Sequence, residues 1–139
     1  MNHIDFYIND LCKNSTELAA IIKDNFFPIG DIPERDVLQP YMVWGSTRNL
    51  EYAKGRLQRA YVGEVVLNLY GSDLKQLNDL SVVLEDLFHG QEGSLVVETT
   101  TINLNDLAFE GVEIPEFDED QLLFVVTCNL RYALQLVTA

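Results

Sequence analysis

Few side chains in this sequence of 139 residues have the type and spacing to carry chemistry. The two histidines, His3 and His89, have no cysteine or carboxylate at the spacing of a metal site. His89 falls in the last turn of an expected helix, where the helix dipole favours a cation. No nucleophile elbow, phosphate-binding P-loop or zinc-protease motif occurs. The sequence therefore predicts a protein that is not an enzyme, with no catalytic residue, no cofactor and no metal.

The two cysteines, Cys12 and Cys128, fall in an expected helix and an expected strand. Free cysteines behave as small hydrophobic residues in a reducing compartment, so we expect both thiols to be free and buried. The first residues do not show the basic and apolar regions of a signal peptide. No apolar run approaches the roughly 20 residues that cross a bilayer. We expect a soluble protein that is made in a cytoplasm and has no membrane partner.

A cluster of cations stands out because the chain is acidic overall. It has 22 Asp and Glu against 9 Lys and Arg, a formal net charge of −13, which argues against general nucleic-acid binding. Four of the nine cations lie in residues 48–60, between two expected strands. We expect this stretch to contact another subunit or a partner protein. The candidate interface residues are Arg48, Tyr52, Lys54, Arg56 and Arg59.

An acidic segment lies nearer the C-terminus, from Asn105 to Asp120. It contains seven carboxylates and no cation. Their spacing does not reproduce the ligand pattern of an EF-hand, so a solvated or partner-facing loop is the better interpretation. The carboxylates of this candidate loop are Asp106, Glu110, Glu113, Glu116, Asp118, Glu119 and Asp120.

The hydrophobic periodicity predicts the elements that position these charges. Helices are expected over 4–13, 14–24 and 72–89, and strands over 41–46, 61–70, 94–104 and 121–134. Asn14 or Ser15 and Ser72 are the helix-capping candidates, and Gly90 is the expected left-handed stop. Trp44 is expected in the core. The predicted fold is a single α+β domain, residues 1–139. It has a four-stranded antiparallel sheet of two hairpins, with the N-terminal helices and one long bridging helix packed on it.

This order of elements resembles a known family. Two N-terminal helices, a proline-containing approach to "PYMVWG", a connection, and "RAYVGEVVLNLYGSDLKQLNDLSVVLEDLF" are together similar to the tail completion, or tail terminator, proteins of long-tailed bacteriophages. The resemblance covers roughly residues 15–135. The first helix and the acidic segment are where this chain differs from the family pattern.

The resemblance implies a structural role in the virion, at the junction of tail and neck. Such proteins assemble as a ring, usually of six subunits, on the end of the tail tube. The partners implied are other copies of the chain, the major tail tube protein and the head–tail connector. The genome would pass through the ring without specific binding, and the protein would be made in the host cytoplasm.

The two charged segments suggest how such a ring could assemble. A ring needs a contact in which one patch meets a different patch on the next subunit. The cationic and acidic segments could form that contact, or one could face the tube and the other the neck. Both versions predict assembly that weakens with salt. Three alternatives remain open at this stage: another neck component such as a head-closure ring, a small ligand-binding α+β domain, and charged loops that are solvated and have no partner.

Overall fold

The computed structural model describes residues 2–32, 37–54 and 58–138. These residues form three α-helices, a short 3-10 helix (Ile29–Asp31) and eight strands. The helices are α1 (His3–Lys13), α2 (Thr16–Ile22) and α3 (Leu74–Phe88). The strands are β1 (Phe26–Pro28), β2 (Tyr41–Ser46), β3 (Asn49–Lys54), β4 (Gln58–Gly71), β5 (Gly93–Val97), β6 (Thr100–Val112), β7 (Glu116–Asp118) and β8 (Leu123–Thr138).

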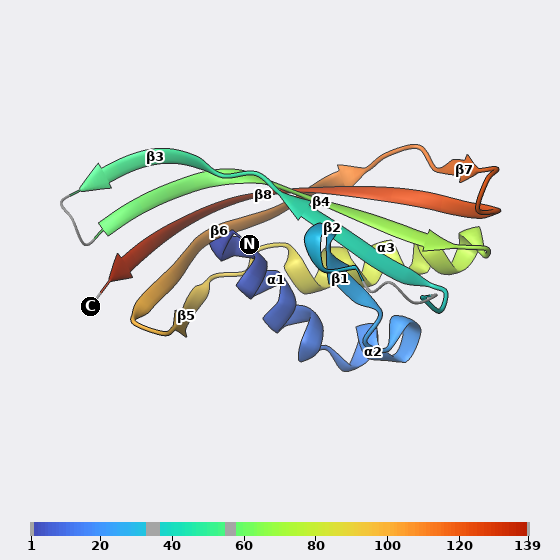
Figure 1. The fold of residues 1–139 in the computed structure, drawn as a ribbon, viewed down its shortest axis with the longest axis horizontal. Coiled ribbons are helices and arrows are strands. Elements are labelled where there is room, and N and C mark those ends of the chain that lie inside the picture. Colours follow the sequence, from blue (N-terminus) through green and yellow to red (C-terminus); the bar gives the residue numbers. More distant parts are fainter. Residues whose placement is uncertain (1, 33–36, 55–57, 139) are drawn as a thin grey trace.

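All eight strands belong to one curled sheet, in the order β1-β2-β4-β8-β6-β5. Strand β3 pairs with β4 beyond the end of β2, and β7 pairs with β8 beyond the end of β6. The β1–β2 pair is parallel and the other pairs are antiparallel. The sheet arches over the three helices, which all lie on its inner face (Figure 1).

This architecture shows that the predicted fold class is wrong. The chain does not form a four-stranded sheet of two hairpins bridged by one long helix; it forms a mostly β half-barrel of eight strands with three short helices. Three of the four expected strands are present, and the expected strand 94–104 is divided by a turn between β5 and β6. Strands β4 and β8 have 14 and 16 residues, and every residue of β4 pairs with β8. Because these two strands are so long, the expected connection 48–60 and much of the expected acidic loop become further strands beside them.

The helix ends follow the sequence signals with one exception. Ser15 caps α2 as predicted, since its side chain accepts a hydrogen bond from the Leu18 backbone N–H. Gly90 follows α3 with a φ of 78°, so the predicted left-handed residue is confirmed. The cap of α3 is Asp73 rather than Ser72. The Asp73 carboxylate accepts from two backbone N–H groups of the first turn, whereas the Ser72 N–H donates to the Gln39 side chain.

The core lies between the helices and the inner face of the sheet. Alternate residues of β4 and β8 point toward the helices, as their period-2 pattern predicts. The buried core residues from the helices and from these two strands include Ile4, Ile8, Leu18, Ile22, Leu77, Leu80, Leu84, Phe88, Val65, Leu67, Leu69, Val126, Cys128, Leu130 and Tyr132. Leu122 falls within the expected strand 121–134 but lies exposed before β8.

The two cysteines are free and buried, as predicted. Burial in an apolar environment raises the pKa of both thiols, to about 12 for Cys128. Thiols of this kind react slowly because the thiolate is scarce at neutral pH. Cys12 and Cys128 therefore act as core residues.

Candidate interaction surfaces

The expected cationic connection is a β-hairpin, which we call the arm. It consists of residues 49–54 of β3 and residues 58–62 of β4, which pair antiparallel with a register shift between Leu50 and Tyr52. The arm extends along the long axis of the molecule, away from the helices (Figure 1). Strand β3 has β4 as its ladder partner among the strands that the structure describes, so its other edge is open.

The five candidate interface residues lie at different positions relative to the arm. Arg48 precedes the arm, and its guanidinium carbon lies 5.4 Å from the ring centroid of Tyr61, a cation–π arrangement. Arg59 lies on the arm and is exposed. Tyr52 and Lys54 belong to β3, and Arg56 lies outside the described residues. Arg48 and Arg59 are both exposed, and Arg48 also contacts the Tyr61 ring.

The predicted acidic loop is mostly strand. Asp106 and Glu110 lie in β6, Glu116 and Asp118 lie in β7, and the other three carboxylates lie in the connections on either side of β7. Six of the seven carboxylate residues are exposed. The exception is Asp118, which accepts hydrogen bonds from the backbone N–H groups of the turn before β8. The expectation of a free loop is wrong, but the carboxylates do line one edge of the sheet.

The arm and β7 lie at opposite ends of the sheet (Figure 1), whereas Asp106 pairs with Ala133 of β8, the residue that also pairs with Val62 of the arm. The arm pairs with the C-terminal part of β8, from Ala133 to Val137, while β7 pairs with its first residues, Leu123 to Val125. Sixteen residues of strand span about 50 Å. The arm and β7 therefore do not meet within one chain.

Exposed apolar side chains at the acidic end were missed by the sequence analysis. Ile114 is 89% exposed, Leu122 is 67% exposed and Phe117 is 49% exposed. The Phe117 ring lies 5.0 Å from that of Phe124, measured between centroids. The signal was present in the alternation of "VEIPEF", but the carboxylates between the apolar residues led to a prediction based on charge alone.

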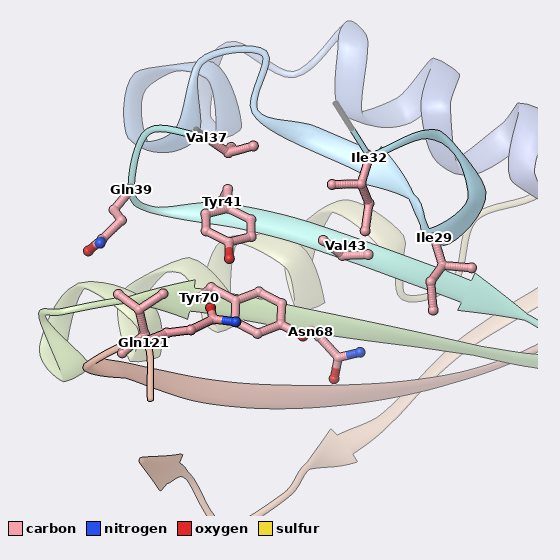
Figure 2. A pocket seen from close by; sticks show the side chains of 10 residues that line it. Ile29, Ile32, Val37, Gln39, Tyr41, Val43, Asn68, Tyr70 and Gln121 are labelled. Atoms are coloured by element: carbon pink, nitrogen blue, oxygen red, sulfur yellow. The ribbon is translucent and has the colours of Figure 1, made fainter. Parts of the chain in front are cut away.

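A groove of about 700 Å³ opens on the outer face of the sheet, away from the helices (Figure 2). The rings of Tyr41 and Tyr70 stack at its wall, with centroids 4.9 Å apart and an interplanar angle of 14°. Burial, followed by the neighbouring Tyr70 and Asp118, raises the pKa of the Tyr41 phenol. The described residues that line the groove carry no charge: Ile29, Ile32, Val37, Gln39, Tyr41, Val43, Asn68, Tyr70, Gln121 and Leu123. Such a lining suits an apolar or hydrogen-bonding segment rather than a phosphate.

A buried polar cluster joins α1 to β2. The Asp5 carboxylate accepts hydrogen bonds from Trp44 Nε1 (3.1 Å), from Ser46 Oγ (2.9 Å) and from the Asn2 backbone N–H (2.8 Å). Trp44 is fully buried, which confirms its predicted place in the core. All three donors are satisfied by one carboxylate, so this cluster is a structural joint between helix and sheet.

The surroundings of the two histidines are structural as far as the described residues show them. Within residues 2–32, 37–54 and 58–138, no group of three or more metal-ligating side chains comes together. His89 is the C-terminal cap residue of α3, and its Nδ1 accepts a hydrogen bond from the Phe109 backbone N–H (3.0 Å). The Nδ1 of His3 is buried without a hydrogen-bond partner. None of the described helices has the length and apolar character that a bilayer span requires.

Comparison with known proteins identifies a fold and not a family. No family model matches the sequence, and no curated protein is similar to it in sequence. In structure, the chain is similar to a chain in the virion of a native gene transfer agent particle. The TM-score is 0.68 at 14% sequence identity, and the match covers 91% of this chain and 90% of that chain. The protein thus has the fold of a virion component over nearly its whole length.

Proposed function

We propose that this protein is a structural protein of a phage-like virion. In this role it forms a ring on the end of the tail tube, stops tube growth and joins the tail to the head. The observation that carries the proposal is the fold shared with a component of a gene transfer agent virion over 91% of this chain and 90% of that one. The resemblance of the sequence to tail terminators supports the same role, which needs no catalysis and no cofactor.

The charge distribution of the chain supports a ring. A closed ring requires two different surfaces on each subunit that match each other. The arm and the edge around β7 carry opposite charge and lie at opposite ends of the sheet, so they supply two such surfaces. The net charge of −13 supports passage of DNA without binding, because like charge repels the phosphate backbone.

Tube growth in the presence of the purified chain tests the proposal. The cognate tail tube protein is allowed to polymerise with and without this protein, and tube lengths are measured by negative-stain electron microscopy. We expect shorter tubes that carry additional ring density at one end. Tubes of unchanged length without end density would contradict the proposal.

Isolated tails and capsids separate the terminator role from that of a head-closure ring. A terminator stays on tails that have never joined a head, so an antibody to this chain should label the ends of free tails. Label on capsids and none on free tails would assign the protein to the head side of the neck and would refute tube capping.

A further inference from the structure

We propose that the acidic end of one copy docks onto the arm of a second copy. The acidic end comprises residues 112–122, and the arm comprises residues 49–54 and 58–62 as defined above. The proposal rests on the ring of the proposed function and adds which surfaces form the contact between its subunits. In this contact Ile114 lies beside Leu50 of the neighbouring copy, and the carboxylates around Ile114 face Arg59.

The exposed apolar side chains of the acidic end call for a covering partner. Single exposed apolar residues are common on protein surfaces. Here Val112, Ile114, Phe117 and Leu122 are all exposed within eleven residues at one end of the sheet. Leu122 also has a φ of 56°, a left-handed conformation that is unfavourable for a leucine. A conformation that strains an apolar residue and leaves it in solvent is consistent with a surface that is covered in an assembly.

The charge of the arm makes it a suitable surface to cover the exposed apolar side chains of the acidic end. Residues 112–122 contain five carboxylates and no cation. The arm contains two cations, Lys54 and Arg59, and one carboxylate, Glu51, and the cation Arg48 directly precedes it. Leu50 is 59% exposed on the arm and provides an apolar counterpart for Ile114. Complementary charge of this kind fixes the register of a contact and disfavours pairing of like surfaces.

Geometry requires that the partner be a second copy. The acidic end and the arm pair with opposite ends of β8, so they are separated by most of its length within one chain. Each of β3 and β7 is paired with a single described strand, which leaves both surfaces accessible at the sheet margins. A contact between two different surfaces repeats from copy to copy and closes when the rotation allows it.

Crosslinking of single-cysteine variants tests the contact directly. Full-length Leu50→Cys chain and Ile114→Cys chain, one of them carrying a size tag, are mixed and treated with a short bismaleimide. The native thiols of Cys12 and Cys128 are buried and do not compete. We expect a crosslinked heterodimer as the main product. The matched control replaces the Leu50→Cys chain with Val82→Cys, since Val82 is 56% exposed on α3, outside the proposed contact.

Charge variants decide whether the crosslink reports the proposed register. Arg59→Glu in the Leu50→Cys chain should lower the crosslinking yield about fivefold, the effect of losing one favourable charge pair. Glu116→Arg in the Ile114→Cys chain should restore it. A heterodimer yield equal to that of the Val82→Cys control, or a predominant homodimer of Ile114→Cys, would overturn the proposal.

The crosslinking experiment and the tube assay test the contact and the capping role separately. The crosslink is measured on the purified chain without tail tubes. Capped tubes without a crosslink between positions 50 and 114 would refute this contact and leave the capping role intact. A crosslink without tube capping would support the contact and refute the capping role.

Discussion

At the scale of single residues, Gly63 is the described glycine whose added Cβ would meet the closest neighbours. It lies on β4 opposite Tyr132 of β8. The Tyr132 hydroxyl donates a hydrogen bond to the Thr47 carbonyl (2.6 Å). A Cβ on Gly63 would overlap the same carbonyl and would lie 2.8 Å from the tyrosine ring. The absence of a side chain at Gly63 is what allows the tyrosine to cross the strand and tie β8 to the residue that follows β2.

Replacing Gly63 by alanine should therefore destabilise the fold. The Thr47 carbonyl is backbone and cannot move aside freely, so we expect a loss of about 1–3 kcal/mol in the free energy of unfolding. Urea denaturation measures it. Gly111→Ala is the matched control, because a Cβ there meets nothing within 4 Å and Gly111 also lies in a strand. Equal effects of the two substitutions would refute the role assigned to Gly63.

His3 should make the stability of the protein depend on pH. Burial, and then the Arg48 cation, lowers the pKa of this imidazole from its ordinary value of 6.5. Below pH 6.5 the unfolded chain binds the proton more readily than the folded chain. The free energy of unfolding should therefore fall as the pH drops from 6.5 to the lower folded pKa, and this contribution should stay constant below that.

Comparison of the wild-type chain with His3→Gln isolates this effect from that of the many carboxylates. The difference in the free energy of unfolding between the two chains should change across this interval, with the wild-type chain losing more stability. Chemical denaturation from neutral pH to about pH 5 provides the measurement. Parallel curves for the two chains would show that His3 is not linked to folding.

At the scale of elements, the start of α3 shows that two neighbouring residues can both suit the N-cap position while only one makes the capping hydrogen bonds. Ser72 and Asp73 are both favoured capping residues, but the Asp73 carboxylate makes the bonds. We expect Asp73→Ala to cost about 1 kcal/mol in the free energy of unfolding, within the usual range for a lost cap. Ser72→Ala should have little effect. Thermal or urea unfolding of the two variants measures both losses in the free energy of unfolding. A larger loss for Ser72→Ala than for Asp73→Ala would restore Ser72 as the cap.

The helices and the longest strands could be predicted because their signals are local. Leu77, Leu80 and Leu84 recur at helical spacing, and Val65, Leu67 and Leu69 alternate as a strand does. Each pattern reflects one buried face. The structure confirms α3, most of β4 and most of β8 for this reason.

Strand β2 was also predicted, over 41–46. The short strands β1, β3 and β7 were not predicted, and a turn and irregular pairing hide the period of β5 and β6. In β6, register shifts between Leu104 and Asp106 and between Phe109 and Gly111 interrupt the alternation of buried residues. The carboxylates then made the segment look like a loop. A tight turn after Val97 separates β5 from β6, with Glu98 at a φ of 55°, in a stretch that looked like one continuous strand. Bulges and turns of this kind are fixed by pairing with distant strands, which a local pattern does not contain.

The charge of the candidate surfaces could be predicted from the sequence, but their position in the fold could not. The acidic and cationic segments are visible in the sequence, but the placement of β7 and the arm at opposite ends depends on the long pairing of β4 with β8. The stacked Tyr41 and Tyr70 come from strands that are adjacent in the sheet and distant in the sequence. The contact of Arg48 with the Tyr61 ring also depends on the fold, while Arg48 stays exposed and its role at an interface stays a prediction.

At the scale of the whole molecule, two electrostatic effects oppose each other when copies meet. Each chain carries a formal net charge of −13, so whole molecules repel. The arm and the acidic end attract each other locally. Which effect dominates depends on the ionic strength, because the screening length is about 30 Å at 0.01 M, about 8 Å at 0.15 M and about 3 Å at 1 M.

Association of the purified chain should therefore be strongest at intermediate salt. At 0.01 M the repulsion reaches across the molecule, at 0.15 M the screening length of about 8 Å leaves mainly the contacting charges, and at 1 M these too are screened. Sedimentation velocity at the three salt concentrations measures the weight-average mass, which we expect to be highest at the middle one. Arg59→Glu should abolish the decline above 0.15 M, because the local attraction is then already lost. Association that rises steadily with salt would mean that apolar burial alone holds the copies together, and the charged surfaces would have no part in it.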